Sequence, residues 1–154
     1  MIKHKEEHFS RFSAKQLCAL LADVENYPEF LPWCTDARVL SREGNVIIAE
    51  LVISFGFLSE RYVSEVVLVQ PKSDKANHEI IVNLIEGPFN ELQNRWSFEW
   101  DKSQNQTKVV FEIGLELKSL ILQKMIDSMF ESSLKKMIRS FEARAEKVYG
   151  STLQ

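Results

Sequence analysis

Cysteine, proline and glycine are scarce in this chain of 154 residues, with two, four and five copies. Cys18 and Cys34 lack the paired spacing of a zinc site or a redox motif, so we expect no metal and a reducing, cytoplasmic setting. No segment approaches the roughly 18 apolar residues of a membrane span, and the charged N-terminus lacks the apolar stretch of a secretory signal. The net charge of −3 provides no overall positive field to attract DNA.

Catalytic motifs are also missing. The sequence contains no nucleophile elbow, zinc-protease helix or glycine-rich phosphate loop. His4 and His8 share one face of a predicted strand near the N-terminus, where we expect a solvated pair rather than a metal site. Cys34 has no basic neighbour in sequence that would lower its pKa. We therefore expect a protein that is not an enzyme.

The chain does contain one long amphipathic segment. Over residues 119–149 apolar side chains recur every three or four positions, and no Gly or Pro interrupts them before Gly150, which predicts one continuous helix. Such a helix is roughly 45 Å long, more than a compact domain of this size needs. It carries Met125, Met129 and Met137, and methionine is flexible enough to suit a surface that adapts to a ligand.

The segments before this helix are short and separated by turns. They are rich in β-branched and aromatic residues, which predicts strands, and no helices separate them, which favours an antiparallel sheet. A short helix follows Ser13, its predicted N-cap, and a loop with two prolines spans residues 23–34. The strands are expected at residues 2–12, 37–42, 46–55, 58–69, 79–85, 93–100 and 108–117, with breaks at Gly56 and at residues 71–74.

These patterns predict an α+β fold in which a curved antiparallel sheet wraps around the long helix. We expect a single domain over residues 1–150 and a short tail at 151–154. The aromatic side chains either fill a solid core or line an apolar cavity between the two layers, and the pattern leaves both open. In the loop, Leu31 lies between Phe30 and Pro32, where we expect an apolar lip at a pocket mouth that meets a ligand or a membrane surface.

Three segments resemble motifs of the coenzyme Q-binding protein family. They are Tyr27-Pro28-x-Phe30-Leu31-Pro32-x-Cys34, Gly87-Pro88-Phe89-x-x-Leu92-x-x-x-Trp96-x-Phe98 and Phe141-x-x-Arg144-Ala145-x-x-Val148-Tyr149. The resemblance extends over nearly the whole chain, from about residue 7 to residue 149. It implies a START-like helix-grip fold with an apolar tunnel between the sheet and the helix.

The resemblance also implies two roles, between which the shared motifs do not decide. Eukaryotic members are ubiquinone chaperones that support respiration. A bacterial branch consists of ribosome-association toxins that bind the large ribosomal subunit and inhibit translation initiation. This chain begins almost at its first strand, without the presequence of mitochondrial members, so we expect a bacterial protein that is cytoplasmic or peripheral at the inner membrane. Polyketide cyclases belong to the wider superfamily, but no acid/base group here favours an enzyme.

We therefore expect non-enzymatic binding of ubiquinone or a similar polyisoprenoid lipid, with no other cofactor. Ribosome binding is the alternative: the acidic net charge disfavours it, whereas the basic group Lys135, Lys136 and Arg139 on the helix leaves it open. The predicted tunnel residues are large and mostly aromatic. They are Tyr27, Phe30, Leu31, Pro32, Phe55, Tyr62, Trp96, Phe98, Phe111, Met125, Met129 and Phe130.

Overall fold

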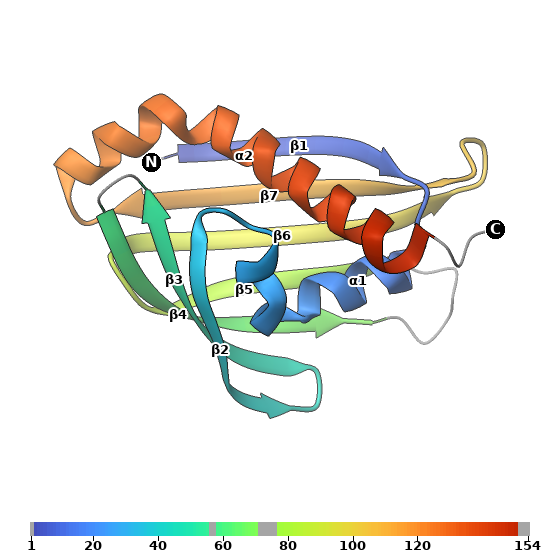
Figure 1. Ribbon diagram of the computed structural model, residues 1–154, viewed down its shortest axis with the longest axis horizontal. Coiled ribbons are helices and arrows are strands. Elements are labelled where there is room, and N and C mark those ends of the chain that lie inside the picture. Colours follow the sequence, from blue (N-terminus) through green and yellow to red (C-terminus); the bar gives the residue numbers. More distant parts are fainter. Residues whose placement is uncertain (1, 56–57, 71–76, 151–154) are drawn as a thin grey trace.

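A curved sheet and a long helix form the two layers of the protein (Figure 1). The computed structural model describes residues 2–55, 58–70 and 77–150, and of Phe55 and Leu58 only the backbone. The elements in this part of the chain are β1 (Ile2–Ser10), α1 (Ala14–Ala22), the 3-10 helix η1 (Val24–Glu29), β2 (Cys34–Glu43), β3 (Val46–Phe55), β4 (Leu58–Val69), β5 (His78–Glu86), β6 (Phe89–Asp101), β7 (Gln106–Leu117) and α2 (Leu120–Tyr149).

All pairs in the sheet are antiparallel, in the order β1-β7-β6-β5-β4-β3-β2. The first strand therefore pairs with the last, with Ile2 opposite Leu115 and Ser10 opposite Thr107. Register shifts interrupt the pairings β2–β3, β4–β5 and β6–β7. Such irregularities increase twist and bend a strand, which lets the sheet curve around α2. The predicted α+β fold is confirmed.

Helix α2 confirms the predicted C-terminal helix. It is 30 residues long, and Ser119 caps it by accepting a hydrogen bond from the Leu122 backbone N–H at 3.3 Å. Burial along it is uneven, because Leu134 and Phe141 are buried whereas Leu120 and Ile121 at its start are 80% and 75% exposed. The first turns of α2 therefore extend over the sheet without packing tightly onto it. No helix in the described ranges is both long and apolar enough to cross a bilayer.

The short helix α1 begins at a capping box. The Gln16 backbone N–H donates to the Ser13 hydroxyl at 3.1 Å, and the Ser13 backbone N–H donates to the Gln16 side chain at 3.0 Å, which confirms the predicted cap. The following loop is more ordered than expected, because η1 occupies part of it and contains Pro28. Such short 3-10 turns are frequent connectors between helices and strands, and this one places the side chains of the loop.

Several expected boundaries shift once the strands pair. β6 begins at Phe89, four residues before the expected start, because Phe89 pairs with Leu117 of β7. Trp100 shares a strand face with buried Trp96 but is 45% exposed, since the β6–β7 hairpin extends beyond α2 (Figure 1). The expected breaks at Gly56 and at residues 71–74, and the tail at 151–154, lie outside the described residues.

Candidate functional site

Three cavities lie in a row between the sheet and α2. The inner and middle chambers measure about 130 Å³ each, and the outer chamber measures about 20 Å³. The middle and outer chambers share Ile53, Ile126 and Met129. Because neighbouring chambers share walls, we treat the row as one channel. The inner and middle chambers share Trp33, Tyr62, Leu92, Phe111, Ile113 and Met137.

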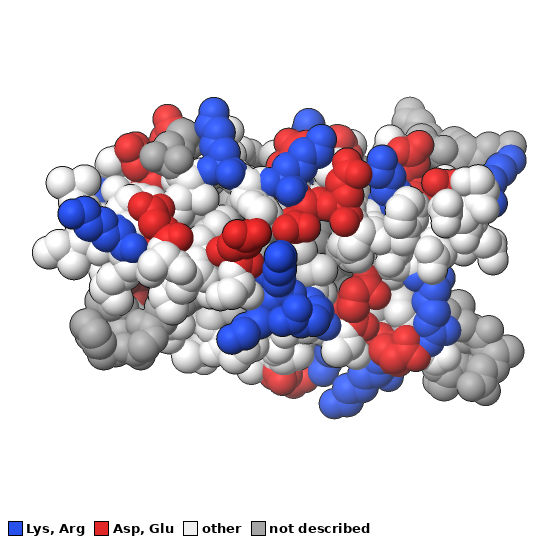
Figure 2. Space-filling model, turned by 90° about the horizontal axis from the view of Figure 1, so that it is seen from above, with Lys and Arg blue, Asp and Glu red and all other residues white. Residues whose placement is uncertain are grey.

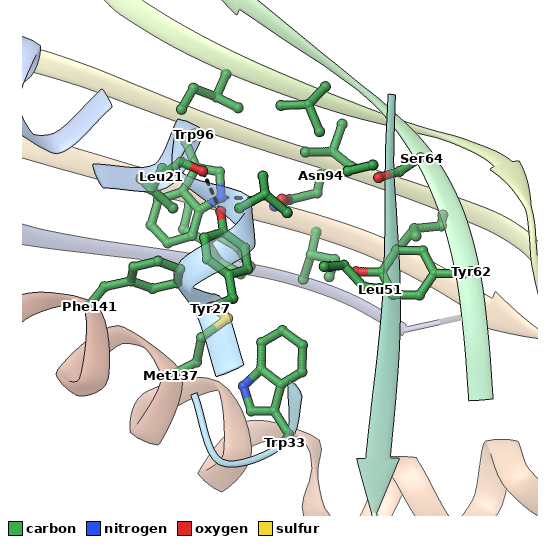
Figure 3. Close-up of a pocket in the computed structure, with 18 residues that line it drawn as sticks. Leu21, Tyr27, Trp33, Leu51, Tyr62, Ser64, Asn94, Trp96, Met137 and Phe141 are labelled. Atoms are coloured by element: carbon green, nitrogen blue, oxygen red, sulfur yellow. Dashed lines mark hydrogen bonds between the residues drawn. The ribbon is translucent and has the colours of Figure 1, made fainter. Parts of the chain in front are cut away.

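The inner chamber has several polar side chains in its wall. Tyr62 and Ser64 stand two residues apart on β4, so both side chains project to the same face of the sheet. Figure 3 shows their hydroxyls and the amide of Asn94 turned toward the chamber, opposite Met137 and Phe141 of α2. Burial raises the pKa of Tyr62, so its phenol stays protonated at physiological pH.

The middle chamber is almost wholly apolar. Its walls come from β3, β4, β6, β7 and α2, together with Trp33. Among the described lining residues, Ser133 supplies its one hydroxyl apart from the shared Tyr62. Among the described residues, no Asp, Glu, His, Lys, Arg or Cys lines the inner or the middle chamber. An apolar cavity of about 150 Å³ can hold benzene, so each chamber has room for about one ring-sized group. Two such chambers in series suit an elongated apolar molecule.

An aromatic cluster around Phe141 closes the inner end of the channel. The Phe141 ring centroid lies 5.5 Å from that of Tyr27, 5.3 Å from that of Phe30 and 5.6 Å from that of Trp96. The guanidinium of Arg144 lies 5.2 Å from the centroid of Phe30. Residues from all three sequence motifs thus meet here and hold the loop against α2.

The glycine of the second motif positions a channel side chain. A Cβ atom at Gly87 would lie 2.6 Å from the Cβ atom of Tyr62, closer than van der Waals contact allows. Phe89 packs edge-on against the Tyr62 ring, with centroids 5.7 Å apart. The backbone between β5 and β6 therefore determines where Tyr62 enters the channel.

We expect Gly87→Ala to lower the free energy of unfolding by roughly 2–4 kcal/mol, because overpacking adds to an unfavourable backbone conformation. Gly44→Ala is the matched control: Gly44 has a φ of 57° but nothing within 4 Å of an added Cβ, so roughly 1–2 kcal/mol is expected there. Urea denaturation measures both values. Equal losses in the free energy of unfolding for the two variants would mean that the close approach of the new methyl group to Tyr62 does not destabilise the protein.

Several predicted tunnel residues lie on the channel. Tyr27, Tyr62, Trp96 and Phe111 line the inner chamber, and Tyr62 and Phe111 also line the middle one. Their role in ligand binding stays a prediction. The predicted helix residues also lie there: Phe130 lines the middle chamber, Met129 the middle and outer ones, and Met125 the outer one.

Other predicted residues lie away from the channel. The lip hypothesis is wrong for Leu31, which is 1% exposed in the core, because the backbone turns inward as the Leu31 N–H donates to the Tyr27 carbonyl at 2.8 Å. Phe98 is also 1% exposed and packs beside α1 rather than along the channel. The last two loop residues differ: Phe30 belongs to the aromatic cluster, and Pro32 is exposed. The side chain of Phe55 lies outside the described residues.

The channel residues that were not among the predicted tunnel residues come from the strands, from the helix and from the loop. Ser64 lies two positions after Tyr62, so strand alternation could have identified it. Met137 lies on the apolar stripe of the helix, and Trp33 lies in the first motif. Asn94 carries no signal of its own, since a polar residue in a strand more often faces solvent.

The remaining titratable candidates are structural. His4 and His8 are not a solvated pair: they are half-buried, with Nε2 atoms 2.8 Å from Glu6 and 3.3 Å from Glu142, because the inner face of β1 lies under α2. No group of three His, Cys, Asp or Glu in the described residues could hold a metal ion. Burial raises the pKa of the Cys34 thiol to about 11, which leaves it protonated and unreactive.

Comparison with known proteins identifies the family to which this chain is similar. The family model described as polyketide cyclase / dehydrase and lipid transport matches residues 11–142. The ribosome association toxin RatA of Rickettsia prowazekii is 36% identical over 148 residues, which cover 96% of this chain and 99% of the toxin. The mitochondrial coenzyme Q-binding protein COQ10 of Dictyostelium discoideum is 34% identical over 145 residues, which cover 92% of this chain and 68% of that protein.

Solved structures agree with this placement. An 18 kDa protein from Caulobacter crescentus is 32% identical, with a TM-score of 0.75 over 97% of this chain and 99% of that one. A START superfamily protein from Mycobacterium smegmatis shares the fold at 17% identity, with a TM-score of 0.74. The predicted START-like fold and the predicted family are both confirmed. The chain belongs to the polyketide cyclase / dehydrase and lipid transport family, in the group that contains the ribosome association toxins and the coenzyme Q-binding proteins.

Proposed function

We propose that this protein binds the large ribosomal subunit and inhibits translation initiation, in the bacterial cytoplasm. The shared sequence motifs do not decide between this role and quinone chaperoning, which the sequence analysis gave as its main expectation. The observation that carries the ribosomal proposal is the 36% identity to a ribosome association toxin along 99% of that toxin's length. The coenzyme Q-binding relative is nearly as similar, but this chain spans only 68% of it.

The outward face of α2 offers the surface for such contact. Lys135, Lys136 and Arg139 are exposed within about one turn of the helix, and Lys135 is paired with Glu131 at 3.7 Å. Figure 2 shows a group of Lys and Arg side chains near the middle of the upper face of the molecule, with acidic side chains around it. Contact with ribosomal RNA through this basic group would be local, because the net charge of the chain is −3.

Replacing Lys135, Lys136 and Arg139 together by Glu tests the proposal. We expect the unmutated protein to sediment with the large subunit, increasingly weakly as salt is raised, because phosphate contacts release counterions. The triple variant should lose this binding by at least roughly tenfold. Thermal melting should change little, since exposed charges contribute at most about 1 kcal/mol each.

The matched control replaces Lys15, Lys102 and Lys118 by Glu. These residues are also exposed but lie on other elements, so the change in net charge is the same while the basic group on α2 is kept. This control should sediment like the unmutated protein. Equal binding by all three proteins, or no binding by the unmutated one, would rule out the ribosomal proposal as stated.

The channel favours a second function, the non-enzymatic binding of ubiquinone or a similar isoprenoid lipid. Two apolar chambers of about 130 Å³ in series, without an acid/base side chain among their described lining residues, suit storage rather than catalysis. Burial of a hydrocarbon chain contributes about 25 cal/mol per Å². Mass spectrometry of an organic extract of the purified protein tests this function, and near-stoichiometric quinone is the expected result. The two functions use opposite faces of α2, so one chain can have both.

A further inference from the structure

The start of α2, residues 120–129, carries apolar side chains on both of its sides. Leu122 and Met125 line the outer chamber, whereas Leu120 and Ile121 are 80% and 75% exposed. Along the rest of the helix the exposed side chains are mostly charged or polar. A helical segment that is apolar all round is normally buried all round. We therefore expect a partner to cover the outward side of this segment.

Hydrogen bonds fix the helix start to the sheet. The Lys118 backbone N–H donates to the Pro88 carbonyl at 2.9 Å, and the Leu117 backbone N–H donates to the Gln123 side chain at 2.7 Å. The bend between β5 and β6 and the end of β7 thus hold the first turns in place. Figure 1 shows these turns at the end of the molecule opposite the β6–β7 hairpin. The exposed pair is therefore presented by an ordered backbone at one end of the protein.

The small size of the exposed apolar pair favours a lipid surface over a protein partner. A stable protein interface engages about 20–30 residues on each side, whereas Leu120 and Ile121 are two residues at a tip. Figure 2 shows uncharged side chains at the extreme left of the upper face, where α2 begins, beside a basic one. A side chain that enters hydrocarbon gains its transfer free energy by itself, so a bilayer needs no extended complementary surface.

Charge around the helix start is balanced. Lys118 and Lys124 are exposed, Asp127 accepts a hydrogen bond from Gln123 at 3.1 Å, and Glu60 lines the outer chamber. With these two cations and two acids, neither sign dominates. Insertion of apolar side chains, rather than attraction between opposite charges, would therefore hold a bilayer there. The two lysines can extend their ammonium groups to the level of the lipid headgroups.

We propose that the start of α2 docks this protein on a phospholipid bilayer, with Leu120 and Ile121 inserted among the acyl chains. The outer chamber lies on the other side of the same helical turns, so docking brings its apolar wall to the membrane surface. A lipid can then pass between the bilayer and the channel. This exchange rests on the lipid-binding function given above as the second candidate, whereas docking itself does not.

Vesicle flotation with the full chain tests the docking. The vesicles contain three parts of phosphatidylcholine to one part of phosphatidylglycerol. The test variant combines Leu120→Gln with Ile121→Gln, which removes both apolar side chains and keeps good helix formers at the start of α2. The matched control combines Leu40→Gln with Val148→Gln, at positions that are 49% and 44% exposed on β2 and on the last turn of α2.

We expect the unmutated protein to float with the vesicles. High salt should weaken this binding by less than about threefold, because salt screens charges but not apolar insertion. The test variant should bind at least roughly tenfold more weakly, and the control should bind within about twofold of the unmutated protein. Thermal melting should change little in either variant, since all four positions are exposed. The salt response also separates docking from ribosome binding, which should weaken steeply.

Several outcomes would overturn the inference. The unmutated protein might be recovered entirely below the vesicles, or the test variant and the control might float equally well. A steep loss of flotation with salt would show that charge, not insertion, holds the vesicles. Sedimentation equilibrium without lipid that finds a dimer of the unmutated protein and a monomer of the test variant would assign the pair to a second copy of the chain. Normal flotation together with a lipid-free organic extract would remove the lipid-binding function and leave the docking in place.

Discussion

Replacing Leu31 by Lys is expected to lower the free energy of unfolding by roughly 4 kcal/mol or more, a large part of the stability of a domain. Leu31 is 1% exposed within the main apolar core, so the new ammonium group would be buried without a partner. The backbone there has little freedom to swing outward, because the Leu31 N–H is bonded to the Tyr27 carbonyl and the Leu31 carbonyl accepts from Cys34. Urea denaturation followed by circular dichroism measures the loss.

Leu40→Lys is the matched control for this change. Leu40 lies on β2 and is 49% exposed, so the same substitution there should change stability by no more than about 0.5 kcal/mol. A similarly small effect at Leu31 would restore the interpretation of the loop as an apolar lip. A large effect at Leu31 alone would establish that the proline-containing motif closes the core.

Phe141→Ala is expected to cost roughly 3–5 kcal/mol, the range for removing a buried aromatic side chain. Phe141 is 8% exposed and packs against three other rings. Its loss opens the inner end of the channel and releases the loop from α2, so the environment of Trp96 should change as well. Urea denaturation gives the free energy, and tryptophan fluorescence of the folded variant reports the local change.

Phe9→Ala provides the comparison for Phe141. Phe9 lies on edge strand β1 and is 45% exposed, so its truncation should cost less than about 1 kcal/mol. Similar losses at the two positions would contradict the view that the cluster around Phe141 is close-packed. A large loss at Phe141 with unchanged fluorescence would place its contribution outside the Trp96 contact.

Much of the fold could be predicted from the sequence. The bounds of β3 and β4 coincide with the predicted strands, because long runs rich in β-branched residues end at clear turn signals. Helix α2 also coincides closely with its prediction. Apolar side chains spaced by three and four over 30 residues fit an α-helix and do not fit a strand. The site could be predicted only in part, as Tyr62 was found but its neighbour Ser64 was not.

The sequence by itself therefore determined the element types, the antiparallel class and the family motifs, because these depend on local periodicity and residue order. Tertiary structure decided that Leu31 is buried, that Ile121 is exposed and that a channel separates the layers. Periodicity shows which side chains share a face, but it does not show which face is covered or how far apart two layers lie. The distance between the sheet and α2 depends on how strongly the sheet curves. That curvature arises from register shifts in three strand pairs and from the pairing of β1 with β7, which are far apart in sequence.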